Sequence, residues 1–338
     1  MSNVLRRSAI RSSRSPFLAG LALLILAPAF AQSTNSCFPA ISSADIDSVH
    51  VNIAPNADAR VKAIHVNVNL TLVPVTVTDS TGHPVLGLQK NDFTVFENGA
   101  PQQIHHFSSE DGPISVGLIV DVSGSMKDKL ESLRSAVDQF FLNANPEDDF
   151  FAVAVSDRPH ILGNASQSID EIQKHLGLIQ PAGNTALLDA IYLGALQLQH
   201  ASYPRRALVI ISDGADNASR YHFKEIKSML EEADIEVYAI GLFEPGLLKS
   251  YEEIVGKKHL FELTAATGGR TLAIDNLGAL SNAAAQISLE LRNQYILGYK
   301  PQPTGANETR RKIKVRLTPQ SDPSLLLQAH YKKAYSVP

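Results

Sequence analysis

The fold of this chain is decided by the stretch VGLIVDVSGSM, residues 116–126. Its first part, Val116 to Val120, is continuously apolar, and such a run is typical of a strand buried on both faces of a sheet. The polar residues Asp121, Ser123 and Ser125 directly follow this run. Apolar side chains then recur at helical spacing, at Leu130, Leu133, Val137 and Phe140. The stretch therefore predicts a buried strand that passes through a polar turn into a helix.

The same alternation of short apolar runs with helical periodicity continues to about Asn293. A second helical pattern has Leu188, Ile191, Ala195 and Leu198 on one face, and a last helix is expected from Leu277 to Arg292. Four further strands are predicted, at Phe150 to Val155, Ala207 to Ile211, Val237 to Phe243 and Thr271 to Ile274. This order indicates an α/β domain over residues 113–293, with a doubly wound and mainly parallel sheet.

The segments on either side of the α/β pattern are predicted to be strands and turns. Apolar residues occupy alternate positions up to Leu72 and then continue at Val73, Val75 and Val77, so the alternation shifts by one residue. This shift next to Pro74 favours a bulge or an edge position there. Residues 294–338 are too short to bury a core of their own. We therefore expect residues 65–112 and 294–338 to form one small β-sandwich-like domain around the α/β domain. A separate tail is the alternative.

The N-terminus has the pattern of a targeting segment. Arginines up to Arg14 precede an apolar run from Phe17 to Phe30, and Ala29-Phe30-Ala31 suits a signal peptidase. We predict a signal peptide over residues 1–31 and a linker over residues 32–64. The mature chain is then exported, to the periplasm or the medium, without a membrane span. An uncleaved anchor is the alternative, although the run is short for one.

Composition excludes several classes of protein. The chain has 338 residues, of which 44% are hydrophobic, enough for ordinary globular cores. Four of its 30 basic residues lie in residues 1–31, so the chain after them has 26 basic against 34 acidic residues. That balance argues against nucleic acid as a partner. The single cysteine, Cys37, excludes an intramolecular disulfide and any site built from several cysteines.

Three segments place oxygen-bearing side chains at expected strand ends or helix starts. In an extended turn, Asp121, Ser123 and Ser125 point to one side. Thr185 follows Gly183-Asn184 at the start of a helix, and Asp213 directly follows the third strand. Because open α/β sheets bind ligands at the carboxyl ends of their strands, these five side chains are candidate metal ligands. Each segment alone would also suit a turn or a helix cap.

The five candidates are all hard oxygen donors. Such donors suit Mg²⁺, or alternatively Mn²⁺ or Ca²⁺, and offer nothing to soft metals. Hydroxyls of Ser123, Ser125 and Thr185 could bind the ion directly, while Asp121 and Asp213 hold it directly or through water. A vacant coordination position would then attract a carboxylate from another molecule.

The combination of Asp121-Val-Ser-Gly-Ser125-Met, Gly-Asn-Thr185 and Ser-Asp213-Gly resembles the metal-ion-dependent adhesion site of von Willebrand factor type A domains. The resemblance covers about residues 115–292, and the flanking β segments resemble exported bacterial proteins built around such a domain. It implies a doubly wound fold with a divalent ion at the top of the sheet and protein recognition through that ion. Asn184 stands where a glycine is common in the family.

These observations favour a non-enzymatic binding or adhesion module. Its partner is expected to be a protein or surface polymer that presents a carboxylate to the ion. Two alternatives remain open: a metal-assisted hydrolase with His160 or His222 as its base, and a structural envelope protein whose metal is structural.

Overall fold

The computed structural model describes residues 70–163, 169–243, 250–302, 310–318 and 326–336. These residues fall within one compact unit of the chain. The expected signal peptide, residues 1–31, and linker, residues 32–64, lie outside the described residues.

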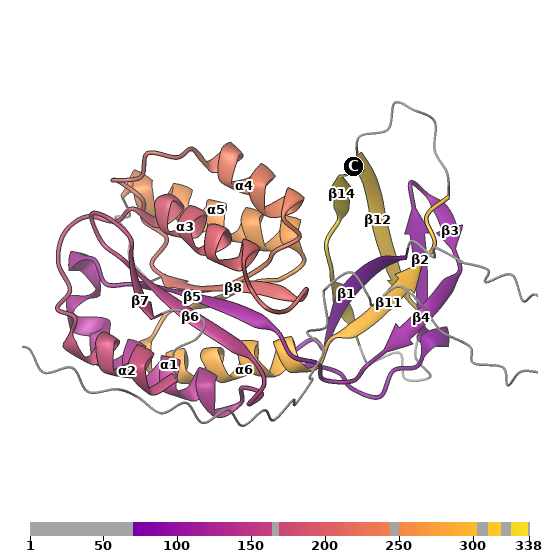
Figure 1. Ribbon diagram of the computed structural model, residues 1–338, viewed down its shortest axis with the longest axis horizontal. Coiled ribbons are helices and arrows are strands. Elements are labelled where there is room, and N and C mark those ends of the chain that lie inside the picture. The colour runs from indigo at the N-terminus through magenta and orange to yellow at the C-terminus, as the bar shows by residue number, and fades with distance from the viewer. Residues whose placement is uncertain (1–69, 164–168, 244–249, 303–309, 319–325, 337–338) are drawn as a thin grey trace, which may run out of the picture. The chain divides into compact units, whose positions relative to one another are not determined.

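A six-stranded sheet forms the centre of the described α/β segment (Figure 1). Its strands are β5 (Ser115–Asp121), β6 (Asp149–Val155), β7 (His160–Gly163), β8 (Arg206–Ser212), β9 (Glu236–Leu242) and β10 (Thr271–Ile274). They lie in the order β10-β9-β8-β5-β6-β7. All neighbours are parallel except β6 and β7, so the mainly parallel sheet predicted from the sequence is confirmed.

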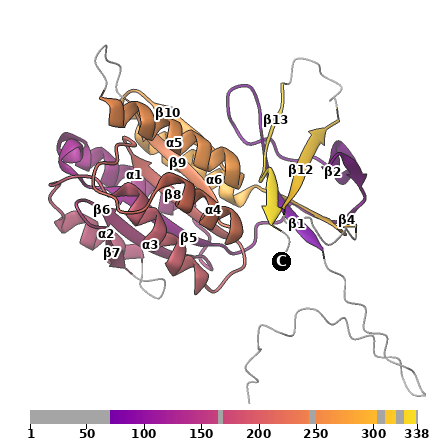
Figure 2. The ribbon, with the colours of Figure 1, turned by 90° about the horizontal axis from the view of Figure 1, so that it is seen from above.

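Helices cover both faces of this sheet. They are α1 (Leu130–Leu142), α2 (Ile169–Leu178), α3 (Leu187–Gln199), α4 (Phe223–Glu232), α5 (Tyr251–Thr267) and α6 (Leu280–Arg292). One buried core joins α1, α2 and α6 to the sheet, and a second joins α3, α4 and α5 to its other face (Figures 1 and 2). The arrangement is the predicted doubly wound fold, because successive residues of β5 have side chains in opposite cores: Leu118 packs with α1 and Ile119 with α3.

Short 3₁₀ helices connect some of these elements: η1 (Lys90–Asp92), η2 (Gly124–Lys129) and η3 (Leu277–Ala279). The predicted last helix, Leu277 to Arg292, is thus divided into η3 and α6. The Asn276 side chain caps η3 by accepting a hydrogen bond from the Ala279 amide at 3.0 Å.

Two antiparallel sheets form a β module beside the α/β segment. The first has the order β13-β1-β11-β4 and the second β14-β12-β2-β3. Their strands are β1 (Thr71–Thr78), β2 (Phe93–Glu97), β3 (Ala100–Gln102), β4 (Ile104–Ser108), β11 (Tyr295–Tyr299), β12 (Arg310–Leu317), β13 (Gln328–His330) and β14 (Ala334–Ser336). In both sheets, strands from before the α/β segment pair with strands from after it, as β1 does with β11 and β2 with β12.

The out-of-phase pattern around Pro74 is not caused by a bulge, and β1 is an interior strand of its sheet, between β13 and β11. Val73, Val75 and Val77 all pack in the core of the β module, and the register between β1 and β11 is continuous through Pro74. On its other side, β1 pairs with β13 only from Thr76 to Thr78. Pro74 therefore lies in a part of β1 that is paired with a neighbouring strand on one side only, which suits a residue without a backbone N–H.

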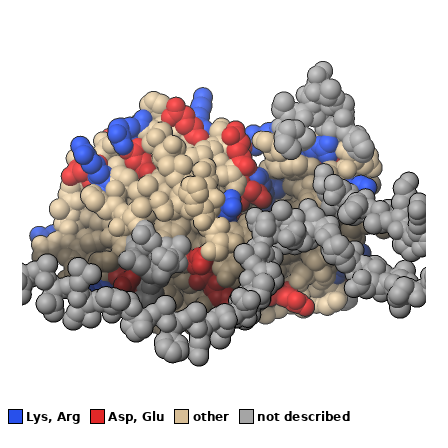
Figure 3. Space-filling view, in the orientation of Figure 1, with Lys and Arg blue, Asp and Glu red and all other residues tan. Residues whose placement is uncertain are grey.

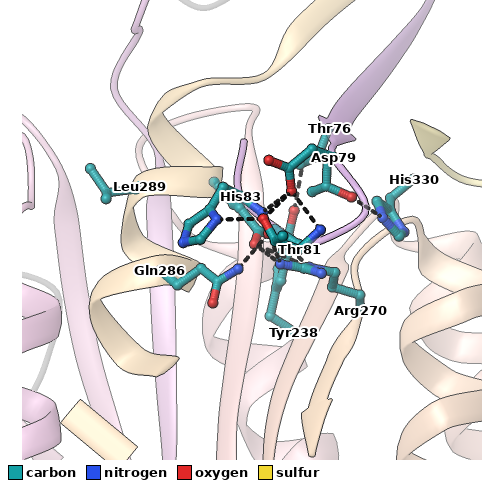
Figure 4. A network of polar contacts seen from close by, with 12 residues as sticks. Thr76, Asp79, Thr81, His83, Tyr238, Arg270, Gln286, Leu289 and His330 are labelled. Atoms are coloured by element: carbon teal, nitrogen blue, oxygen red, sulfur yellow. Dashed lines mark hydrogen bonds and ion pairs between the residues drawn. The ribbon is translucent and has the colours of Figure 1, made fainter. Parts of the chain in front are cut away.

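Buried polar contacts join the β module to the α/β segment (Figure 4). The hydroxyl of Tyr238 on β9 bonds that of Thr76 on β1 at 3.1 Å, and Arg270 Nη2 donates to the carbonyl oxygen of Gly82 at 2.6 Å. Arg270 also donates through Nε to both carboxylate oxygens of Glu290, which is fully buried on α6. One guanidinium thus connects the turn after β1 to the last helix of the α/β segment.

The surface shown in Figure 3 carries basic and acidic side chains interspersed, with no broad basic area among the residues described there. This agrees with the acidic balance of the sequence after residue 31. Within the described ranges, no helix has the length and apolar composition that crossing a membrane requires.

Candidate functional site

The candidate site begins where two neighbouring parallel strands end. β5 ends at Asp121 and β8 ends at Ser212, and the two strands are in register, Val120 opposite Ile211. Both oxygens of the Asp121 carboxylate accept hydrogen bonds, one from the Ser123 amide at 2.9 Å and one from the Ser212 hydroxyl at 2.7 Å. Asp121 is fully buried. The strand ends therefore fix this carboxylate in one orientation.

A continuous row of oxygen atoms leads from the buried site to the surface. The hydroxyls of Ser123 and Ser125 hydrogen-bond at 3.2 Å, and the Ser125 hydroxyl donates to Asp213 Oδ2 at 2.8 Å. Ser123 and Asp213 are buried, whereas Ser125 is exposed. Four of the five predicted residues, including Asp121 beneath Ser123, thus converge at one end of the sheet.

The fifth residue, Thr185, lies on a loop held beside this row by backbone contacts. The Gly124 amide donates to the Gly183 carbonyl at 3.0 Å, and the Ala182 amide donates to the Val122 carbonyl at 3.1 Å. The Thr185 side chain is buried, and among the described residues no hydrogen bond joins its hydroxyl to the other four side chains. The structure therefore brings the Thr185 loop to the site without a side-chain hydrogen bond to the other four residues.

Three residues that position the site were not singled out as such by the sequence: Ser212, Asp216 and Asn217. Asn217 Oδ1 accepts a hydrogen bond from the Thr185 amide at 2.9 Å, and Asp216 Oδ2 accepts one from the Leu188 amide at 3.0 Å. The N-cap residue of α3 is Ala186, so the first turn is capped from the loop after β8. The sequence signal that could have identified them is the density of polar residues directly after a buried strand, in the loop of residues 212–219.

The electrostatics of the site suit a cation. Burial raises the pKa of Asp121 to about 6, the Asp213 charge adds to the rise, and hydrogen bonds from Ser123 and Ser212 oppose it. A positive ion close to both carboxylates would stabilise their charged forms. Because the other candidate donors are hydroxyl oxygens, the residues present fit a hard divalent cation.

A different kind of metal site is not formed in the described part of the chain. No group of three or more His, Cys, Asp or Glu side chains lies there in a position to hold a metal. The candidate site has only two carboxylates, and its remaining donors are hydroxyls. The candidate donors at this site are therefore the hydroxyls of Ser123, Ser125 and Thr185 beside the carboxylates of Asp121 and Asp213.

The two histidines considered as bases for a hydrolase lie on other elements. His160 is on β7, the antiparallel edge strand, and His222 directly precedes α4, where its amide donates to Glu225 Oε2 at 2.8 Å. Neither ring makes a hydrogen bond to the five candidate ligands among the described residues.

Comparisons with known proteins agree with the fold of this segment. A family model described as von Willebrand factor type A domain matches residues 116–215. No curated protein matches the chain significantly.

Several solved structures are similar to this chain at low identity. A von Willebrand factor type A protein from Catenulispora acidiphila is similar with 12% identity and a TM-score of 0.47, over 75% of each chain. Proximal thread matrix protein 1 from the mussel byssus has 16% identity and a TM-score of 0.47, over 58% of this chain and 51% of its own, so this chain spans about half of that protein.

The mussel protein has also been solved with a zinc-occupied MIDAS motif, at 16% identity and a TM-score of 0.45, over 59% of this chain and 50% of its own. An aerotolerance-related membrane protein from Bacteroides fragilis is similar over 53% of this chain and 98% of its own, with 19% identity and a TM-score of 0.41. The family match over residues 116–215, on a segment with this doubly wound fold, identifies that part of the chain as a von Willebrand factor type A domain.

Proposed function

We propose that this chain is a binding module that holds a divalent cation and uses it to capture a carboxylate of a partner molecule. Asp121, Ser123, Ser125, Thr185 and Asp213 are the residues that would hold the ion. Mg²⁺ is the expected ion, with Mn²⁺ or Ca²⁺ as alternatives. The ion would supply an electrophilic coordination position to an acidic group of a protein or surface polymer.

The observation that carries this proposal is the row of oxygen atoms from Ser123 through Ser125 to Asp213, with Asp121 fixed beneath it. Side chains that are distant in the sequence meet there, and Ser125 is exposed to a ligand. Ser212 orients Asp121, so part of the arrangement is held before any ion binds. Such a set of neutral hydroxyls and two carboxylates leaves a divalent ion able to accept a further anionic ligand.

We infer a binding role rather than catalysis. A hydrolase would need a base within hydrogen-bond reach of the attacking group, and His160 and His222 lie on elements that do not contribute to the row. Export to the periplasm or medium and a role in adhesion belong to the same proposal, supported by the N-terminal sequence pattern.

Isothermal titration calorimetry with Mg²⁺, Mn²⁺ and Ca²⁺ tests the ion site. Asp213→Asn is expected to weaken ion affinity by about tenfold or more, because it removes a charged ligand without changing the side-chain volume. Asp138→Asn is the matched control, since Asp138 is exposed on α1 and bonds Gln173 instead. Equal affinity for both variants and the wild type would refute the proposed ligand set.

The capture step is tested by measuring how well immobilised peptides retain the protein, with pairs of peptides that differ only in having Asp or Asn at one position. The wild type is expected to be retained by the Asp peptides in the presence of Mg²⁺ and released by a chelator. If the ion were only structural, the chelator would lower the melting temperature while retention showed no specific preference for Asp. Retention that survives both the chelator and Asp213→Asn would exclude capture through the ion.

A further inference from the structure

An open cleft continues from the candidate ion site along the surface. It has a volume of about 650 Å³, and Ser125 and Asp213 line it at the ion site. Its apolar lining consists of Leu242 at the end of β9, Phe243, Ile254 on α5 and Leu277 in η3. A cleft of this size accommodates one or two large side chains.

The outer face of α5 lines the cleft through Ile254 and carries further exposed apolar residues outside it. The inner face of the helix packs in the core through Leu260 and Leu263, beside β9 (Figure 2). Tyr251, Ile254 and Phe261 nevertheless remain exposed, at 77%, 57% and 41%. Ile254 and Phe261 are seven residues apart and therefore lie on one side of the helix. Clustered exposed apolar residues of this kind mark interaction surfaces more often than isolated ones do.

The charges around the cleft favour an acidic ligand only when the ion is present. Three carboxylates, of Asp128, Asp213 and Glu253, and two lysines, Lys129 and Lys257, line it. Their sum is one negative charge, which a divalent cation at the candidate site changes to one positive charge. Lys257 Nζ lies 4.7 Å from the centre of the Phe243 ring, so part of this positive charge is next to the apolar floor.

We propose that the cleft is the specificity site for a partner segment in which a large apolar side chain lies next to the captured acidic residue. The inference rests on the proposed function, because the acidic residue is the one that the ion would hold. The apolar side chain packs against Phe243, Ile254 and Leu277, and this contact selects among the many carboxylates that any ion could bind.

A random peptide library displayed on phage is the probe. Selection on the wild-type protein with Mg²⁺ is expected to enrich sequences with Asp or Glu next to Leu, Ile, Met or Phe. Ile254→Ser should reduce binding of these peptides by about tenfold or more, because it removes most of an apolar contact. Ile254→Leu should restore binding, and Ile254→Ser should leave calorimetric Mg²⁺ affinity unchanged.

Leu142→Ser is the matched control. Leu142 is the last residue of α1, its side chain is 73% exposed, and it does not line the cleft. It is expected to bind the enriched peptides like the wild type. The specificity site is overturned if the enriched peptides are acidic but lack an apolar neighbour, and if Ile254→Ser binds them as tightly as the wild type does. This outcome leaves the proposed function intact. Enrichment that does not depend on Mg²⁺, or no acidic enrichment, overturns both.

Discussion

At the scale of single residues, Ser212 shows how a residue outside the ligand set can determine the site. Its hydroxyl donates to Asp121 Oδ2 at 2.7 Å and accepts from the Gly214 amide at 2.9 Å. One buried side chain therefore orients a candidate ligand on β5 and begins the turn that carries Asp213. Such outer-shell partners set both the direction and the basicity of the ligands they contact.

Ser212→Ala is expected to lower both stability and ion affinity. The change leaves two buried polar groups without their partner, which costs about 1–3 kcal/mol of unfolding free energy. Urea denaturation followed by circular dichroism measures the first effect, and Mg²⁺ calorimetry the second. Ser288→Ala is the matched control, because it removes a buried hydrogen bond to the Phe140 carbonyl on α1, away from the ligands. If both variants lose ion affinity equally, Ser212 has no positioning role.

At the scale of elements, the close approach of α5 to the loop after β8 determines where Asp213 lies. A Cβ placed on Gly256 of α5 would be only 1.6 Å from the Gly214 carbonyl oxygen. Gly214 itself has φ +83°, a conformation that other residues rarely adopt. The helix can therefore pack against this loop only through a glycine, and the two glycines together fix the turn beside the site.

Gly256→Ala is expected to destabilise the protein, although alanine normally favours a helix. In an unhindered helix the same change stabilises by up to about 1 kcal/mol. Here α5 must move from the Gly214 loop, so the unfolding free energy and Mg²⁺ affinity should both fall. Gly177→Ala on α2 is the control, since nothing lies within 4 Å of its Cβ position, and it should be neutral or slightly stabilising. A stabilising effect of Gly256→Ala would contradict the close approach.

At the scale of the whole molecule, polar groups are buried where the α/β segment meets the β module. A small cavity there is lined by Pro74 of β1, Arg205, Glu236 and Gln294. Gln294 Nε2 donates to Glu236 Oε2 at 2.7 Å, just before the chain enters β11. Burial raises the pKa of Glu236 to about 7. Hydrogen bonds from Gln294 and Tyr238 and the charge of Arg205 act in the opposite direction and lower this pKa. The junction thus favours a protonated carboxyl.

This raised pKa predicts a pH-dependent stability. Because the folded state holds the proton more tightly, the contribution of Glu236 is complete below its ordinary pKa of 4.5 and is lost as pH rises through about 7. Glu236→Gln, which cannot ionise, should therefore melt at a higher temperature than the wild type at pH 8 and lose that advantage near pH 5. If the difference in melting temperature between the wild type and Glu236→Gln stays constant from pH 5 to 8, the raised pKa of Glu236 is refuted.

The sequence by itself determined the doubly wound α/β fold and the set of candidate ligands. Both depend on local patterns: the apolar run before Asp121 specifies a buried strand, and the spacing of Ser123 and Ser125 places their side chains together. Neighbouring parallel strands end at the same edge of a sheet, so the proximity of Asp213 could also be expected. The edge strand β7 has no such distinctive pattern and was not predicted.

Only the tertiary structure decided the contacts between segments that are distant in the chain. The hydrogen bond from Ser212 to Asp121, the approach of Gly256 to Gly214 and the cleft floor formed by Phe243 and Ile254 depend on strand register and helix packing. Local pattern specifies which elements form and which faces are apolar. It does not specify the sub-ångström fit between elements, because that fit results from all the packed side chains together.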